Sequence, residues 1–340
     1  MKPYTNTLTA LLNIKSPTGN TEKAISFSEE IFNNLGLKTK RTRKGALIAT
    51  IPGSKEAITF SAHVDTLGAM VKDITAHGTL KLTQLGGYAW TTIEGEHVEI
   101  DTISNKTYTG TVLSTVASSH VHGAKTNATT RDESTLEVRI DEKISNRKDV
   151  EDLGINIGDF VNFDPRTKVT ESGFIKSRHL DDKACVVALF EIAEYFMKNR
   201  PTKTLHFFIS NYEEVGHGAS AAIPENTVEF IALDMAAPGQ GQSSDEFSVT
   251  ICVKDSSGPY DINLKHRLVD IATQTDVPFK LDIYPFYGSD GSAAMRAGYD
   301  FPVALIGPGV DASHSFERTH HEAIDATIKL AIEYIKVYGN

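Results

Sequence analysis

Hydrophobic positions recur every three or four residues near the start of the chain, which is the spacing of an amphipathic helix. This pattern predicts helices over residues 4–14 and 20–36, with the polar turn 16–20 between them. Two short runs rich in β-branched and apolar residues follow over 46–51 and 57–61, and a Pro-Gly turn separates them. The first part of the chain therefore predicts two helices followed by two strands.

The pattern changes between residues 68 and 170. Short segments of alternating apolar and polar residues replace the helical spacing, and Gly, Asn and Asp punctuate them. We find no convincing helix in this stretch, and the run 154–161 has the form of its last hairpin. The stretch therefore predicts a small all-β domain, residues 68–170, inserted into a discontinuous α/β domain of residues 1–67 and 171–340.

After the insertion, helical and strand-like patterns alternate, which is typical of α/β architecture with helices on the faces of a sheet. The predicted helices span residues 180–199, 261–275, 289–297 and 320–338. The predicted strands span residues 204–209, 229–233, 246–253, 279–284 and 303–306.

Composition narrows the function classes. The chain has 340 residues with a formal net charge of −10, and a basic face for nucleic acid is not expected. No apolar run is long enough to span a bilayer, and the N-terminus has no signal-peptide pattern, so we expect a cytoplasmic protein without membrane partners. Cys185 and Cys252 lie far apart in apolar runs and are expected to be buried free thiols.

Asp181 and Asp182 form an acidic pair directly before an apolar helical run. Acids at a helix N-terminus often only cap free amides and complement the helix dipole. The chain also places His63, Glu214, Asp234 and other polar groups at the ends of strand-like runs or in short polar loops. Neutral imidazoles and carboxylates in such positions are the ligands that a divalent metal site needs.

The candidate ligands form a set that is too large for one open tetrahedral zinc site. They comprise two histidines and three carboxylates: His63, Asp181, Glu214, Asp234 and His314. Such a set suits two metals that share Asp181. Asp65 and Glu213 then remain outside the ligand set, and a carboxylate beside a ligand can serve as a proton carrier.

The order of these motifs resembles metallopeptidase family forty-two, the tetrahedral aminopeptidases, which includes glutamyl and deblocking aminopeptidases. The resemblance covers essentially the whole chain and rests on His-x-Asp at 63–65, Leu-Asp-Asp at 180–182, Glu-Glu-Val-Gly at 213–216, Asp234 and His-Ser at 314–315. It implies a zinc-peptidase-like central mixed sheet flanked by helices. It also implies that the β-rich insertion mediates assembly of dimers into a tetrahedral dodecamer.

The resemblance further implies two divalent ions per subunit, zinc first, with cobalt or manganese as possible replacements. One ion would take His63, Asp181 and Asp234, and the other would take Asp181, Glu214 and His314. Glu213 would be the general base and Asp65 the support for His63. The expected activity is removal of the N-terminal residue from short peptides by a water that the metals activate.

The sequence departs from the family near these motifs. The family usually has Glu where this chain has Thr66, and Arg where it has Lys183, and the run 216–218 also differs. Three other functions stay open: a metal-dependent amidase or deacylase on small molecules, a glycoside hydrolase, and a catalytically inactive assembly protein. The histidine ligands and the single tryptophan, Trp90, count against a sugar-binding cleft.

Overall fold

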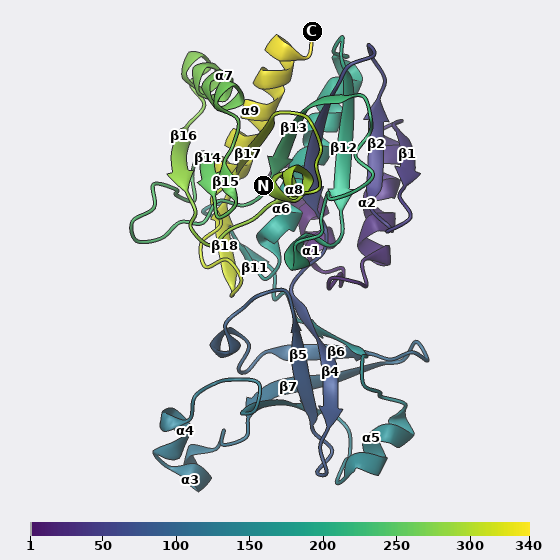
Figure 1. Cartoon of the computed structure of the whole chain (residues 1–340). Coiled ribbons are helices and arrows are strands. Elements are labelled where there is room, and N and C mark those ends of the chain that lie inside the picture. The colour runs from purple at the N-terminus through teal and green to yellow at the C-terminus, as the bar shows by residue number, and fades with distance from the viewer. Residues whose placement is uncertain (1) are drawn as a thin grey trace. The chain divides into compact units, whose positions relative to one another are not determined.

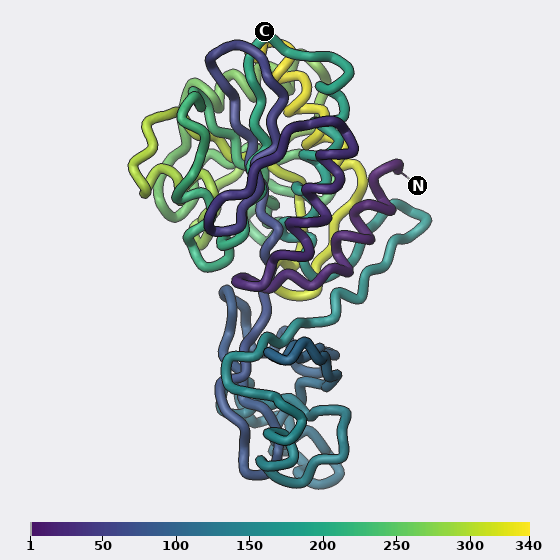
Figure 2. The backbone as a smooth tube through the Cα atoms, turned by 90° about the vertical axis from the view of Figure 1, so that its right-hand side faces the viewer, coloured from purple at the N-terminus to yellow at the C-terminus, as the bar shows by residue number. Residues whose placement is uncertain are grey.

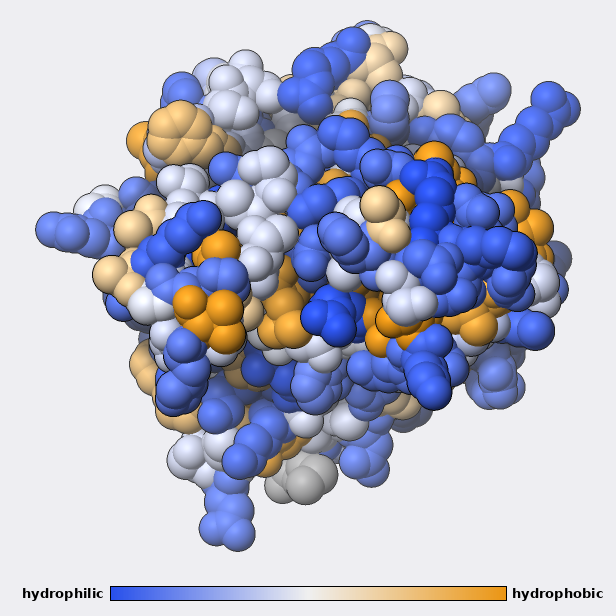
Figure 3. Space-filling view, turned by 90° about the horizontal axis from the view of Figure 1, so that it is seen from below, coloured by the Kyte–Doolittle hydropathy of each residue, from blue (hydrophilic) through white to orange (hydrophobic). Residues whose placement is uncertain are grey.

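The computed structural model describes residues 2–340, which divide into two compact units. The first unit contains the chain up to Thr66 and from Arg166 onwards, and the second unit is Leu67–Pro165 (Figure 1). Among the described residues, no helix is both long and apolar enough to cross a membrane. Hydrophilic residues cover most of the face seen in Figure 3, as the net charge of −10 leads one to expect.

A mixed nine-stranded sheet forms the centre of the first unit. Its order is β1 (Lys38–Arg41), β2 (Leu47–Ile51), β12 (Thr204–Ser210), β3 (Ala57–His63), β13 (Thr227–Leu233), β17 (Val303–Pro308), β14 (Val249–Asp255) and β15 (Gly258–Pro259), with β16 (Phe279–Ile283) paired to β14. Strands β12, β3, β13 and β17 are parallel neighbours. Their carboxyl ends therefore lie at one edge of the sheet.

Helices cover both faces of this sheet. Alternate residues of its central strands point to opposite sides, and apolar side chains on both sides are buried against helices. Phe207 packs into one core and Phe208 into another. The helices are α1 (Thr5–Leu12), α2 (Glu22–Asn34), α6 (Leu180–Lys198), α7 (Ile262–Gln274), α8 (Asp290–Arg296) and α9 (His321–Tyr338). Five of them bury residues in the core that contains Phe207, while α8 contributes to the other; α1 and α2 are the purple coils of Figure 2.

A separate three-stranded antiparallel sheet joins two distant parts of the first unit. It consists of β10 (Lys168–Val169), β11 (Phe174–Ser177) and β18 (Glu317–His320). The register places Ser177 opposite Glu317. This pairing brings the start of α6, which follows β11, next to the loop that precedes β18. The sequence patterns did not predict this sheet, because its strands are only two to four residues long.

The second unit is a closed six-stranded barrel. Its order is β4 (Gly68–Ile74), β5 (Leu80–Leu85), β8 (Leu136–Ile140), β7 (Thr107–Ser114), β6 (His97–Asp101) and β9 (Phe160–Phe163). Along β6, Val98 and Ile100 are buried while His97 and Glu99 are exposed, so the barrel has a core of its own. The predicted fold class, a mixed sheet flanked by helices with a small all-β insertion, is confirmed.

Two details of the insertion differ from the prediction. It contains short helices, α3 (Ser119–His122), α4 (Lys125–Ala128) and α5 (Arg147–Leu153), and a 3-10 turn, η1 (Trp90–Thr92). Helix α5 forms because Asn146 and Asp149 make a reciprocal capping box and Gly154 ends it in the left-handed conformation. The hairpin predicted at 154–161 is wrong, since the segment links α5 to β9, which pairs with β4 and β6.

Candidate metal centre

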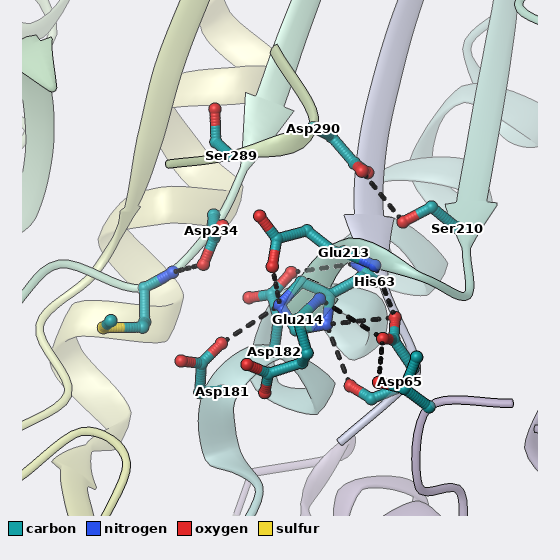
Figure 4. A network of polar contacts seen from close by, with 12 residues as sticks. His63, Asp65, Asp181, Asp182, Ser210, Glu213, Glu214, Asp234, Ser289 and Asp290 are labelled. Carbon is teal, nitrogen blue, oxygen red and sulfur yellow. Dashed lines mark hydrogen bonds and ion pairs between the residues drawn. The ribbon is translucent and has the colours of Figure 1, made fainter. Parts of the chain in front are cut away.

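The carboxyl ends of three neighbouring parallel strands supply three parts of the site, the position where open α/β sheets bind their ligands. His63 is the last residue of β3. Glu213 and Glu214 begin the 3-10 turn η2 (Glu213–Val215), which follows β12. Asp234 comes directly after β13. The sheet order β12–β3–β13 therefore brings these residues together although they are far apart in sequence (Figure 4).

The acidic pair at the start of α6 does not cap a regular helix. Asp181 and Asp182 have non-helical backbone angles, the peptide bond between them is cis, and no side chain caps this helix. Helix α6 begins at Leu180, as predicted, but its first turn is irregular. Both carboxylates are buried and turn toward the strand ends. At this irregular turn the Asp181 N–H donates to Glu317 and the Asp181 carboxylate contacts His63.

Asp181 occupies the middle of the cluster. Its Oδ1 lies 3.1 Å from Nε2 of His63, and its Oδ2 lies 3.3 Å from Nε2 of His314. Each oxygen of one carboxylate thus faces a different imidazole. Glu214 Oε2 lies 3.5 Å from Nε2 of His314, and Glu213 Oε2 lies 3.7 Å from Nε2 of His63. These contacts join four segments of the chain around one side chain.

Two overlapping sets of side chains bring their ligand atoms within 4.8 Å of one another. One set is His63, Asp181 and Glu214, and the other is His63, Asp182 and Asp234. Asp182 was not a candidate in the sequence analysis, although its position beside Asp181 was a signal for it. Its Oδ2 accepts a hydrogen bond from the His63 main-chain N–H at 3.1 Å, so that oxygen is already engaged.

Burial gives these acids a strong need for a cation. It raises the pKa of Glu214 to about 8 and the pKa of Asp234 to about 8, with neighbouring carboxylates adding to the shift of each. Burial also raises the pKa of Glu213 well above its ordinary value. Glu214 Oε1 is buried and has no hydrogen-bond partner among residues 2–340. A nearby cation would stabilise the charged form of these buried carboxylates. Carboxylate oxygens and imidazole nitrogens are also ligands that divalent metal ions bind.

Asp181 and His63 behave differently, because they pair with each other. Burial opposes the charged form of Asp181, but hydrogen bonds from His314 and His63 outweigh it and hold the pKa of Asp181 below its ordinary value. Burial likewise lowers the pKa of His63, yet the hydrogen bond to Asp181 and the charge of Glu213 raise it well above its ordinary value.

Asp65 lies beside the ring of His63 and also contacts the turn that carries the two glutamates. The His63 ring Nδ1 lies 2.9 Å from the main-chain oxygen of Asp65, while the Asp65 Oδ1 is 3.6 Å away. The buried carboxylate instead accepts the main-chain N–H groups of Glu213 and Glu214 at 3.1 and 3.3 Å, and the hydroxyl of Thr18 at 2.6 Å. Asp65 therefore holds the turn that carries both glutamates.

A cavity of about 610 Å³ opens beside the acids. Glu213, Asp234 and His314 lie in one part of its wall, while Phe286 and Arg296 contribute to the rest. Of the three departures from the family pattern, only the run 216–218 reaches this wall, through Gly216. Lys183 is buried, and its Nζ donates to the main-chain oxygen of Ile14 at 2.6 Å.

The sequence analysis also missed Glu317, which is buried in the first unit. Its two oxygens accept the main-chain N–H groups of Asp181 and His314, both at 3.1 Å. The available signal was an acid three residues after His314, and it was weak because acids are common in polar loops. Cys185 and Cys252 are buried free thiols, as predicted.

Comparison with known proteins gives a consistent family match. Residues 45–330 match the model of the M42 glutamyl aminopeptidase family. YhfE of Bacillus subtilis, provisionally named an aminopeptidase, is 49% identical over 330 residues, which are 96% of this chain and 95% of that protein. Lysyl aminopeptidase of Pyrococcus furiosus is 24% identical over 310 residues, covering 89% and 88% of the two chains.

Solved structures share the fold. The TET aminopeptidase of a marine sediment Thaumarchaeota archaeon superposes with a TM-score of 0.87 at 18% identity, covering 97% of this chain and 96% of that one. The TET1 peptidase of Pyrococcus horikoshii, described as assembling into a tetrahedron or a large octahedral shell, gives 0.83 at 22% identity, covering 96% and 98%.

Proposed function

Because this chain belongs to the M42 glutamyl aminopeptidase family, a family of hydrolases acting on peptide bonds, we propose that it is a dinuclear-metal aminopeptidase for short peptides. One observation carries the proposal: the two oxygens of the Asp181 carboxylate face two different imidazoles, at 3.1 and 3.3 Å. A carboxylate that bridges two ions needs this arrangement, with a further ligand on each side.

We assign His63, Asp181 and Asp234 to one ion, and Asp181, Glu214 and His314 to the other. Asp182 is the rival of Asp181 for the first ion, but the His63 main-chain N–H already occupies its Oδ2. Zinc suits the mixed imidazole and carboxylate set, and cobalt or manganese are the alternatives. When bound, two such ions would lower the pKa of a water and polarise the scissile carbonyl.

Glu213 has the position that a general base needs. It lines the cavity, its side chain is 15% exposed, and its main chain is held by Asp65. In this role its carboxylate takes a proton from the attacking water and delivers it to the leaving amine. Nearby positive ions favour its charged form, which opposes the rise in pKa that burial causes. The cavity holds the N-terminal residue of the peptide beside these groups.

The experiment that tests this function is a panel of aminoacyl-arylamides, assayed after chelation and after return of zinc, cobalt or manganese. We expect chelation to abolish hydrolysis and one of the metals to restore it. Full hydrolysis by protein from which all metal has been removed would overturn the proposal. The same panel identifies the preferred N-terminal residue.

The alternative functions lack comparable support. A deacylase on small molecules would use the same residues, so acylated amino acids belong in the same panel. The family match favours neither a glycoside hydrolase nor an inactive assembly protein. Hydrolysis of a cellulose substrate that persists under chelation would favour the glycoside hydrolase.

The barrel unit is proposed as the assembly domain. None of the proposed ligands comes from it, and it exposes large apolar side chains at Ile103, Val121 and Ile157, which are 82%, 74% and 61% exposed. A structure titled as the PhTET1 dodecamer has the same fold, with a TM-score of 0.84.

We therefore expect a particle far larger than the 37.1 kDa chain. Sites enclosed in such a particle would admit only short, unfolded peptides, so hydrolysis should fall steeply as the substrate lengthens. Light scattering and a series of peptides of increasing length test both points. A monomer at micromolar concentration with undiminished activity would contradict the assembly, and a stable dimer would contradict only the dodecamer.

A further inference from the structure

Three buried carboxylates outside the proposed ligand set hold main-chain N–H groups of the site. Asp65 accepts those of Glu213 and Glu214, and Asp182 accepts that of His63. Glu317 accepts those of Asp181 and His314. Glu317 differs from the other two, because it joins two segments that are 133 positions apart and that carry ligands of the same proposed ion.

The position of Glu317 follows from the small antiparallel sheet. Ser177 of β11 pairs with Glu317 of β18, so the chain that leaves β11 toward Asp181 passes beside the start of β18. From there Glu317 Oε2 reaches the Asp181 N–H, and Oε1 reaches the His314 N–H, each at 3.1 Å. Its side chain is almost fully buried, so water does not replace these hydrogen bonds.

The two segments that Glu317 holds depart from regular backbone conformation. His314 has a φ of 62°, in the left-handed region that residues other than glycine rarely adopt, and Asp181 departs from helical angles. His314 lies outside the helices and strands, and Asp181 lies in the irregular first turn of α6. A single side chain, that of Glu317, accepts one hydrogen bond from each segment and so ties the two segments together.

We propose that Glu317 is a positioning residue that fixes Asp181 and His314 relative to each other and so sets the affinity of the ion bound by Asp181, Glu214 and His314. This inference rests on the proposed dinuclear site. Glu317 is not among the ligands that we assign to either ion. Glu317 acts through the main chain of these two ligands. A substitution of Glu317 should therefore change metal affinity directly and catalysis only as a consequence.

The test compares the wild-type protein with Glu317→Gln by titrating the metal-stripped proteins with Zn²⁺ in a calorimeter. The amide has one oxygen in place of two, and its NH₂ group cannot accept the second N–H. We expect one ion to bind with nearly wild-type affinity and the other roughly 10- to 100-fold more weakly, the usual effect of losing an outer partner of a ligand.

Glu229→Gln is the matched control. Glu229 is also buried with both oxygens engaged, by Arg267 at 2.6 Å and by Tyr334 at 2.7 Å, and it lies near the start of β13, away from the strand end that leads to Asp234. This variant should lose stability without any change in zinc binding. It separates the loss of a buried carboxylate in general from the specific role of Glu317.

Folded Glu317→Gln that binds two ions with wild-type affinity would overturn the proposal for Glu317. If thermal unfolding shows that this variant does not fold, the same zinc titration is carried out on Glu317→Asp. It keeps the charge but is one methylene too short to reach both N–H groups, so unchanged affinity there would also overturn the proposal. Failure of the wild-type protein to bind two ions would instead refute the dinuclear site itself.

Discussion

Glu213→Gln is expected to lower kcat by at least roughly a hundredfold while leaving the metal content nearly unchanged. The amide cannot take a proton from the attacking water, but it keeps the shape of the side chain. Glu213 is not among the ligands we assign, and its main-chain N–H would still donate to Asp65. Steady-state kinetics on an aminoacyl-arylamide, with elemental analysis of the same sample, measures both quantities.

The adjacent glutamate provides the control for this prediction. Glu214→Gln should lose metal, because Glu214 Oε2 lies 3.5 Å from Nε2 of His314 and its other oxygen has no protein partner among residues 2–340. If Glu213→Gln loses both metals and Glu214→Gln keeps them, the roles of the two glutamates are reversed. If neither variant changes kcat, the base lies elsewhere.

Asp181→Asn is expected to lose metal and activity together. The asparagine side chain carries no charge and has only one oxygen. It therefore cannot offer one oxygen to the proposed ion beside His63 and another to the proposed ion beside His314, as the carboxylate can. Since Asp181 is a ligand of both proposed ions, the loss of metal affinity should exceed the roughly 100-fold that outer-partner mutations cause. Elemental analysis after dialysis, together with the arylamide assay, measures the outcome.

Asp159→Asn is a suitable control for this variant. Asp159 is buried in the barrel unit, where its Oδ2 accepts the main-chain N–H of Asn156 at 2.8 Å. The substitution makes the same chemical change without touching the site, and metal content should stay at the wild-type value. An Asp181→Asn protein that retains two ions and full activity would show that Asp182 or another acid is the bridge.

The sequence predicted the parts of the fold that depend on periodicity. Helices α7 and α9 and strands β3, β12 and β13 have a clear helical or strand-like spacing, and each lies within two residues of its expected start. Strand ends also predicted which polar residues could meet, because parallel strands deliver them to one edge of the sheet. His63 and Asp234 are found there.

The features that escaped prediction depend on contacts between distant segments. The bend at Asp181 has no signal in its own helical spacing, and it forms where Glu317 accepts the Asp181 N–H. The β11–β18 pair is too short to show a pattern, yet it brings those two residues together. The Asp65 carboxylate lies 3.6 Å from the ring of His63, and its hydrogen bonds to the η2 turn were not predicted. Main-chain hydrogen bonds of this kind leave no periodic trace in a sequence.

The most direct test of the dinuclear site is the anomalous scattering of crystals grown with zinc, recorded at the zinc absorption edge. We expect two peaks per chain, one on each side of the Asp181 carboxylate, with His63 and Asp234 at one peak and Glu214 and His314 at the other. A single peak, or two peaks that do not share Asp181, would contradict the account.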